Sequence, residues 1–255
     1  MEDDRLLGVL DEAVSAIRRA LGAVSDWGLA GTGPGQHYTD LAADAAAVSV
    51  LVDAGLGVLS EESGHHHPER AVTVVLDPVD GSTNAHHGLP WYAASLCAVD
   101  AGGPRAAVVV NLASGTRYQA VRGAGATRDG RRLTLAPRTG SLAQALVALS
   151  GWPGRHLGWY QYRALGAVAL DLCAVADGTV DAYVDCSVDA HGPWDYLGAL
   201  LVCREVGVAV VDVTGRDLVV LDHEARRTPV AASNPELLAE VMAARTGEQP
   251  TPPYP

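Results

Sequence analysis

The residues best suited to chemistry form one short run, Asp77-Pro78-Val79-Asp80-Gly81-Ser82. The run follows an apolar stretch at residues 72–76 that is typical of a buried strand, so both carboxylates are expected at a strand end. Proline fixes its own φ, and glycine lets the backbone turn and approach a ligand closely. If a helix begins here, the free amides of Gly81 and Ser82 face an anion. Taken alone, the run fits an acidic turn followed by a helix cap better than a catalytic site, because such turns are common.

Three further carboxylate positions favour a metal site. Glu61, within Ser60-Glu61-Glu62, ends a short strand pattern, Asp195 begins an apolar helix pattern, and Asp44 lies in an alanine-rich helix pattern. Each has an ordinary explanation, since acidic residues are common on solvated surfaces and at helix N-termini. Together with the run they bring carboxylates from separate segments, and oxygen ligands of this kind suit Mg²⁺. No spacing of His or Cys residues indicates a zinc site.

The histidines are weaker candidates. His65-His66-His67 lies in the polar stretch 63–70, which is predicted to be a surface loop, and adjacent histidines in such a loop are usually only exposed. His191 stands near Trp194 and is a candidate for contact with a substrate. The sequence leaves the roles of both groups open.

The elements that must position these residues divide the chain into two predicted halves. Residues 1–136 read as an α+β half, with two amphipathic helix patterns at 4–25 and 40–54 separated by a glycine-rich break at 28–35. The succession of strand patterns after them indicates an antiparallel sheet flanked by the two helices. These strand patterns cover residues 58–60, 72–76, 92–100, 106–112, 116–122 and 131–135.

Residues 137–255 read as an α/β half, because strand and helix patterns alternate there. The proline-rich tail at 249–255 is expected to fray. We expect the active site between the two halves. The helix patterns cover residues 164–176, 194–206 and 235–245, and the strand patterns cover 147–149, 180–184, 208–212, 218–221 and 229–232.

The composition is that of a globular, acidic protein. The chain has 255 residues, of which 48% are hydrophobic and 19% charged, and its formal net charge is −12. This charge argues against nucleic acid as a partner, because phosphate backbones require clustered cations. No apolar run approaches the roughly 20 residues that cross a bilayer, and the charged N-terminus has no apolar signal region. We therefore expect a cytoplasmic protein without a membrane or nucleic-acid partner.

The order of the motifs resembles the inositol monophosphatase family, within the superfamily of metal-dependent, lithium-sensitive sugar phosphatases. The resemblance extends from about residue 5 to residue 242 and rests on Gly57 to Ser63, on Asp77 to Asn84, and on Trp194-Asp195 followed by Glu205-Val206-Gly207. It implies a layered α-β-α-β-α sandwich, Mg²⁺-dependent hydrolysis of a small phosphate monoester, and a homodimer.

The resemblance also implies a site with two or three Mg²⁺ ions. Carried over position by position, Glu61, Asp77 and the Val79 carbonyl hold one ion. Asp77, Asp80 and Asp195 hold a second ion, and a third, weaker one lies near Glu61 and water. The sequence contains every one of these ligand residues.

The catalytic residues implied by the resemblance are Glu61, Ser82 and Asp44. Glu61 and the Ser82 hydroxyl orient the attacking water, and Asp44 accepts a hydrogen bond from Ser82. The backbone amides of Gly81 and Ser82 hold the phosphate. The full set of residues implied for phosphate and substrate is Asp80, Gly81, Ser82, Thr83, Gly166, Ala167, Val168, Asp185 and Asp195.

The resemblance specifies the reaction more closely than the substrate. An inositol monophosphate, or a related sugar or cyclitol phosphate, is the first candidate. Histidinol phosphate, fructose 1,6-bisphosphate and 3′-phosphoadenosine phosphates are alternatives, and Thr83-Asn84 favours a sugar or inositol phosphate, because nucleotide-directed relatives tend to have Lys-Glu there. A catalytically idle protein that binds metal or a phosphorylated metabolite is an alternative of another class.

Overall fold

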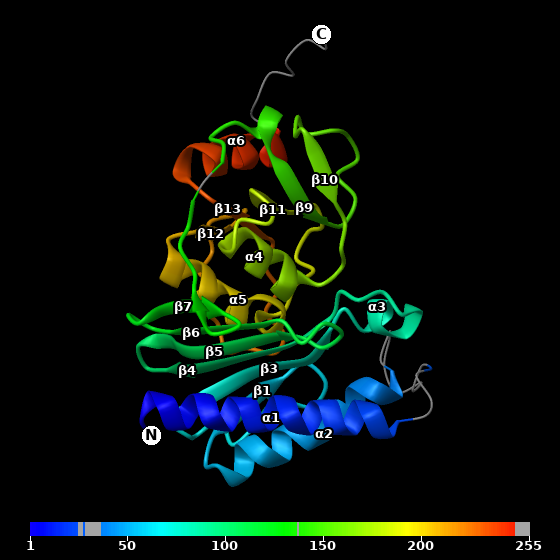
Figure 1. The fold of residues 1–255 in the computed structure, drawn as a ribbon, viewed down its shortest axis with the longest axis vertical. Coiled ribbons are helices and arrows are strands. Elements are labelled where there is room, and N and C mark those ends of the chain that lie inside the picture. Colours follow the sequence, from blue (N-terminus) through cyan, green and yellow to red (C-terminus); the bar gives the residue numbers. More distant parts are fainter. Residues whose placement is uncertain (25–27, 29–36, 137, 248–255) are drawn as a thin grey trace.

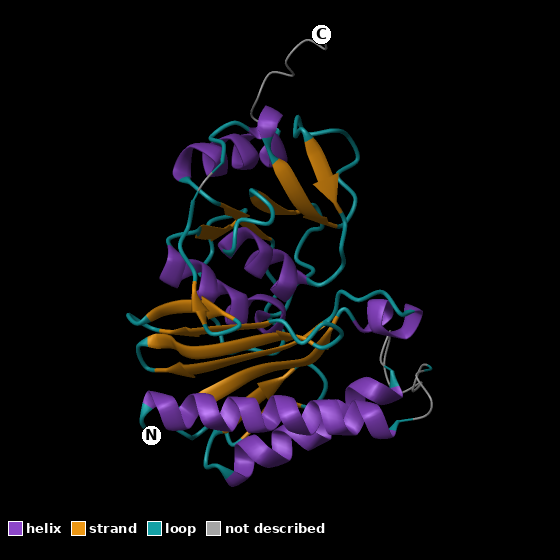
Figure 2. Ribbon diagram, in the orientation of Figure 1, coloured by secondary structure: helices purple, strands orange, loops and turns teal. Residues whose placement is uncertain are grey.

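The computed structural model describes residues 1–24, 28, 37–136 and 138–247 (Figure 1). Apart from Gly28, the glycine-rich break predicted at 28–35 lies outside the described residues, and so does the tail at 249–255. Helices and sheets alternate in five layers along the long axis of the molecule, as Figure 2 shows. The predicted α-β-α-β-α sandwich is confirmed.

In the described part of the chain, the first sheet has eight strands in the order β2-β1-β3-β4-β5-β6-β7-β8. β1 runs parallel to β3, and the other neighbouring strands pair antiparallel. Every residue of β3 is buried, because helices cover both faces of the sheet. The strands are β1 (Gly57–Ser60), β2 (Gly64–His66), β3 (Thr73–Asp80), β4 (Ala93–Asp100), β5 (Gly103–Asn111), β6 (Arg117–Val121), β7 (Gly125–Arg128) and β8 (Arg131–Arg132).

The second sheet, formed within residues 138–247, has five strands in the order β10-β9-β11-β13-β12. β9 runs parallel to β10 and to β11, whereas β13 pairs antiparallel with both β11 and β12. The strands are β9 (Leu146–Ser150), β10 (Gln161–Arg163), β11 (Ala182–Asp185), β12 (Ala209–Asp212) and β13 (Pro229–Ala232).

Helices form the other three layers. α1 and α2 cover the outer face of the first sheet, α4 and α5 lie between the sheets, and α6 covers the outer face of the second sheet (Figure 1). One apolar core therefore extends from Val75 in the first sheet, through α4 and α5, to Tyr183 in the second. Among the described residues, no helix has the length and apolar character needed to cross a bilayer. The helices are α1 (Asp3–Ala23), α2 (Tyr38–Asp53), α3 (Ser82–His87), α4 (Val168–Ala176), α5 (Pro193–Val206) and α6 (Pro235–Thr246), with a 3₁₀ turn at Leu142–Gln144.

The prediction of a surface loop at 63–70 is wrong in part, because Gly64–His66 forms the edge strand β2. The residues of β2 are exposed or half-buried, so they show no apolar pattern that could indicate a strand. β10, whose residues are all exposed, escaped prediction for the same reason. The strand predicted at 131–135 is confined to Arg131–Arg132.

Two other predicted elements differ from the structure, because a glycine or a side chain determines the local backbone conformation. The helix predicted at 164–176 begins only at Val168, because Gly166 has a φ of +86°, which a right-handed helix does not accept. No strand forms at 218–221. There the Asp217 side chain accepts a hydrogen bond from the Val219 amide at 2.9 Å, which competes with strand pairing.

Candidate metal centre and active site

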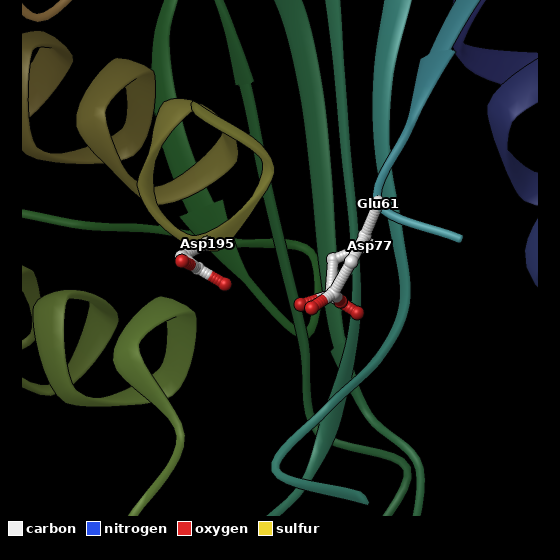
Figure 3. A group of neighbouring side chains, drawn as sticks. All are labelled: Glu61, Asp77 and Asp195. Atoms are coloured by element: carbon white, nitrogen blue, oxygen red, sulfur yellow. The ribbon is translucent and has the colours of Figure 1, made fainter. Parts of the chain in front are cut away.

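Three carboxylates from three elements meet at one point. Glu61 follows β1, Asp77 lies in β3 and Asp195 lies in the first turn of α5, and one ligand oxygen of each lies within 4.8 Å of the others. Figure 3 shows Glu61 and Asp77 side by side, with Asp195 facing them from α5. The first two are aligned because Ser60 pairs with Leu76 in parallel register, so the next residue on each segment carries a carboxylate.

Backbone hydrogen bonds fix the directions of these side chains. Asp77 Oδ1 accepts the amide of the buried Val79 at 2.9 Å. Asp195 Oδ2 accepts the Gly192 amide at 2.8 Å, at the start of α5. The Glu61 amide donates to a β3 carbonyl at 3.0 Å and so extends the pairing of the two strands by one residue. The ligand set is therefore held by regular elements rather than by a free loop.

The carboxylates repel one another. Burial raises the pKa of Glu61, Asp77 and Asp80 well above the ordinary range. Neighbouring negative charges raise it further, chiefly Asp195 for Glu61 and for Asp80, and Glu61 for Asp77. A divalent cation removes this repulsion, and the donors are all carboxylate oxygens, which suit Mg²⁺. The cluster therefore fits a hard metal ion.

Asp80 lies beside the cluster and connects it to α4. Its Oδ1 accepts the Val168 amide at 3.2 Å and its Oδ2 accepts the Ala169 amide at 2.7 Å. Gly81 follows with a φ of +84°, and a Cβ at this position would lie 3.0 Å from the Gly166 carbonyl oxygen. The structure thus brings Asp80 and Gly81 against the segment implied for substrate, and Asp80 already occupies the Val168 amide.

The other residues implied for phosphate and substrate flank this contact. Ser82 and Thr83 form the first turn of α3, where backbone amides have no partner within the helix. Ala167 is the buried N-cap residue of α4. Asn84 ties the two segments together, because its Nδ2 donates to the Leu165 carbonyl at 2.7 Å.

Asp185, at the end of β11, has no exposed surface. Its Oδ1 accepts the Ser187 amide at 2.8 Å, and its Oδ2 lies 3.4 Å from His191 Nε2. His191 Nδ1 in turn lies 3.3 Å from Asp195 Oδ2, so the imidazole stands between the residue implied for substrate and a metal ligand. A direct contact between Asp185 and a substrate requires this imidazole to move.

Two further titratable groups, His191 and Asp171, affect the pKa of Asp80 through their charges. Burial alone lowers the pKa of His191, but the carboxylates of Asp185 and Asp195 outweigh it and raise the pKa to about 10. Burial raises the pKa of Asp171, in α4, to about 7. Asp171 Oδ1 accepts the Trp91 indole N–H at 2.9 Å, whereas its Oδ2 is buried without a hydrogen-bond partner. The sequence patterns indicated neither feature, because both depend on burial.

The acidic residues of α2 are placed differently from expectation. Among the described residues, Asp44 accepts its side-chain hydrogen bond from the Ser60 hydroxyl and none from Ser82, because α2 packs on β1. Asp40, one turn earlier, is buried, and its negative charge contributes to the raised pKa of Glu61. Sequence reasoning took Asp40 only as a helix start, since an Asp at a helix N-terminus is ordinarily a cap.

The histidine triplet lies apart from this centre. His66 Nε2 lies 2.8 Å from the Ser63 hydroxyl, and His67 Nδ1 lies 3.2 Å from an exposed Glu69 carboxylate. Within the described ranges, the only cluster of potential metal ligands is the one formed by the three carboxylates. The triplet therefore has no place in a metal site of the described structure.

Comparison with known proteins gives one family over most of the chain. The model of the inositol monophosphatase family matches residues 36–249. An inositol-1-monophosphatase of Mesorhizobium japonicum is 32% identical over 243 residues, covering 84% of this chain and 88% of that protein. A fructose-1,6-bisphosphatase/inositol-1-monophosphatase of Thermococcus kodakarensis is 32% identical over 217 residues, covering 83% of each. The structure of an inositol monophosphatase from Anabaena has the same fold, with a TM-score of 0.77, 21% identity and 97% of each chain covered.

Proposed function

Because the chain belongs to the inositol monophosphatase family, we propose that it hydrolyses the phosphate monoester of an inositol, or of a related cyclitol or sugar, with Mg²⁺ at the carboxylate cluster. Membership in this family, together with its phosphatase relatives, makes the chain a phosphoric monoester hydrolase. The observation that carries the proposal is the convergence of Glu61, Asp77 and Asp195 within 4.8 Å.

In the proposed mechanism, different residues orient the attacking water, bind the phosphate and hold the loop that carries them. When bound, Mg²⁺ supplies the positive charge that stabilises phosphate oxygens and activates water. Glu61 and the Ser82 hydroxyl orient the attacking water, and Glu61 accepts its proton. The water oxygen bonds to phosphorus while the bond from phosphorus to the alcohol oxygen breaks, and the departing alkoxide takes up a proton from solvent. The amides of Gly81 and Ser82 donate to the phosphate during this exchange. Asp80 holds this loop against α4 through its two backbone hydrogen bonds.

The ligand and substrate sets follow from the same proposal. The site would hold two or three Mg²⁺ ions, with Asp80 and the Val79 carbonyl completing the protein ligands. The leaving alcohol lies toward Asp80 and the segment 166–168, which Gly81 approaches closely. Beside this segment the His191 side chain is partly exposed, whereas the Asp185 side chain is not.

Phosphate release from a panel of monoesters tests the proposal. The panel contains inositol 1-phosphate, fructose 1,6-bisphosphate, histidinol phosphate and 3′-phosphoadenosine 5′-phosphate, each with and without Mg²⁺. Fructose 1,6-bisphosphate is the second candidate, because the Thermococcus relative is named for both activities. Asp195→Asn should abolish Mg²⁺-dependent release, whereas Asp53→Asn, at an exposed site at the end of α2, should not change it. No release from any substrate by metal-loaded protein would leave only the idle, binding alternative.

We further propose that the protein acts in the cytoplasm as a homodimer, with a small phosphorylated metabolite as its partner. Light scattering of the purified protein tests the assembly, because the chain has a mass of 26.4 kDa. A particle of about one chain mass at micromolar concentration contradicts the dimer.

A further inference from the structure

His223 contacts the two segments that carry metal ligands from opposite sides of the centre. It lies in the connection between β12 and β13, and its Nε2 lies 3.0 Å from the Glu61 carbonyl oxygen. A carbonyl only accepts hydrogen bonds, so Nε2 carries the proton and donates it. The ring of His223 also packs against Trp194, with centroids 4.8 Å apart, and Trp194 directly precedes Asp195.

Glu61 is held at both of its backbone polar groups. Its amide donates to the Leu76 carbonyl in β3 at 3.0 Å, and its carbonyl accepts the bond from His223. The first bond belongs to the eight-stranded sheet, whereas the second comes from a residue 162 positions later in the chain. The direction in which the Glu61 side chain leaves the backbone therefore depends on His223.

Further contacts hold His223 itself. The Arg226 guanidinium lies 5.1 Å from the centroid of the Trp194 ring, and Arg226 donates to the His223 carbonyl at 2.7 Å. Trp194 is almost fully buried, whereas about a third of the His223 side chain is exposed. The imidazole is thus fixed against a rigid surface, but it can be replaced without opening the core.

We propose that His223 is a positioning residue for the metal centre, which holds Glu61 at the separation from Asp195 that a divalent cation requires. The inference rests on the proposed function, since it assumes that Glu61 and Asp195 share an ion. Within the described residues His223 is not part of the ligand cluster, and its other nitrogen, Nδ1, lies 3.6 Å from the exposed Glu224 carboxylate. Groups that orient metal ligands in this way typically change metal affinity by about 10–100-fold when they are removed.

Binding of Mn²⁺ to the metal-stripped, full-length protein, with free Mn²⁺ measured by electron paramagnetic resonance, tests this role without a substrate. His223→Phe keeps a ring on Trp194 and loses the donor, whereas His223→Gln keeps an amide donor and loses the ring. His65→Ala is the control, because it removes an exposed imidazole from β2, the strand that pairs with β1 next to Glu61. We expect His223→Phe to bind Mn²⁺ about tenfold more weakly than wild type. His223→Gln should recover most of the affinity, and His65→Ala should match wild type.

Phosphatase assays supply a second readout. In His223→Phe the Mg²⁺ concentration for half-maximal rate should rise, while the rate at saturating Mg²⁺ should fall much less. If His223→Phe does not fold, His223→Ala takes its place in both measurements. Folded His223→Phe with wild-type Mn²⁺ affinity, or folded His223→Gln as weak as His223→Phe, overturns the positioning role alone. Wild-type protein that binds no Mn²⁺ overturns the proposed metal centre as well, so the two failures are distinguishable.

Discussion

Replacing Asp77 with asparagine should stabilise the metal-free protein and abolish its response to Mg²⁺. The side chain is 1% exposed, and its ligand oxygen lies within 4.8 Å of those of Glu61 and Asp195. Asparagine retains an oxygen that can accept the Val79 amide, so the substitution removes a charge with little change of shape. The effect on stability therefore measures the cost of burying this charge together with its repulsion by the neighbouring carboxylates.

The magnitude follows from the geometry. Two unit charges 4.8 Å apart repel by about 3.5 kcal/mol at an effective dielectric constant of about 20. Asp77 has two such neighbours, but the raised pKa of Asp77 and of Glu61 means that protonation already relieves part of the repulsion. We therefore expect the free energy of unfolding to rise by about 1–3 kcal/mol, which corresponds to about 2–10 °C in Tm for a chain of this size.

Thermal unfolding followed by circular dichroism, in EDTA and in excess Mg²⁺, measures both halves of the prediction. In EDTA, Asp77→Asn should melt above wild type. In Mg²⁺ at a thousandfold excess over Kd, wild type gains about 4.1 kcal/mol, and the order should reverse because the variant has lost a ligand. The matched control is Asp212→Asn, a buried aspartate whose carboxylate lies 2.9 Å from Arg216. It should lower the Tm in both buffers, because it removes a favourable ion pair.

The pH dependence of stability tests independently whether ionised Asp77 destabilises the metal-free fold. A carboxyl group whose pKa is raised by folding destabilises the fold when it ionises, and the loss begins above its unfolded value of about 4. Metal-free wild type should therefore lose stability as pH rises from about 4, and Asp77→Asn should lose less. The reasoning is refuted if Asp77→Asn melts below wild type in EDTA, or gains as much as wild type from Mg²⁺.

Three other substitutions probe the surroundings of the centre. Asp171→Asn should raise the Tm at pH 8 but not at pH 4, because burial raises the pKa of this carboxyl from 3.8 to about 7. Its ionisation then costs up to about 4 kcal/mol, and an equal effect at both pH values would contradict this account. Gly81→Ala should lower phosphatase activity by about tenfold or more and the Tm by several degrees, since φ is +84° and the new Cβ would lie 3.0 Å from the Gly166 carbonyl oxygen. Unchanged activity would mean that this contact does not shape the site. His191→Ala should alter KM for inositol 1-phosphate by about threefold or more, because the imidazole covers Asp185. A KM equal to that of wild type would show that the ring does not border the substrate.

The metal centre was accessible to sequence reasoning because its ligands follow regular elements. Asp77 comes directly after an apolar strand pattern, and Glu61 ends another, so the pairing of β1 with β3 places them side by side. Asp195 begins an apolar helix, where an acid at the first turn is conspicuous. Most strands and helices of the two halves followed from periodic patterns, since buried strands and amphipathic helices carry the strongest signals. Their arrangement in five layers was implied by the family resemblance.

The contacts that depend on packing could not be predicted in the same way. Asp40 and Asp44 occupy one helix four residues apart, and only the docking of α2 on β1 decides which partners each one meets. His223 reaches Glu61 across 162 positions of sequence, and no local pattern indicates that bond. The covering of Asp185 by His191 likewise depends on the path of the loop that joins β11 to α5. Burial and long-range contacts are properties of the assembled layers, so a single sequence reveals them poorly.

The position of α5 between the two sheets has a consequence for how the molecule assembles. Glu61 and Asp77 are brought together as soon as β1 and β3 pair, but Asp195 arrives only when α5 has packed on both sheets (Figure 1). The complete ligand set thus requires the assembled middle layer, and a bound ion favours the fully assembled chain over every partly assembled one. Transient detachment of α5 would break the same set and weaken the hold on an ion. A bound ion would therefore stabilise the packing between the layers as well as take part in the chemistry.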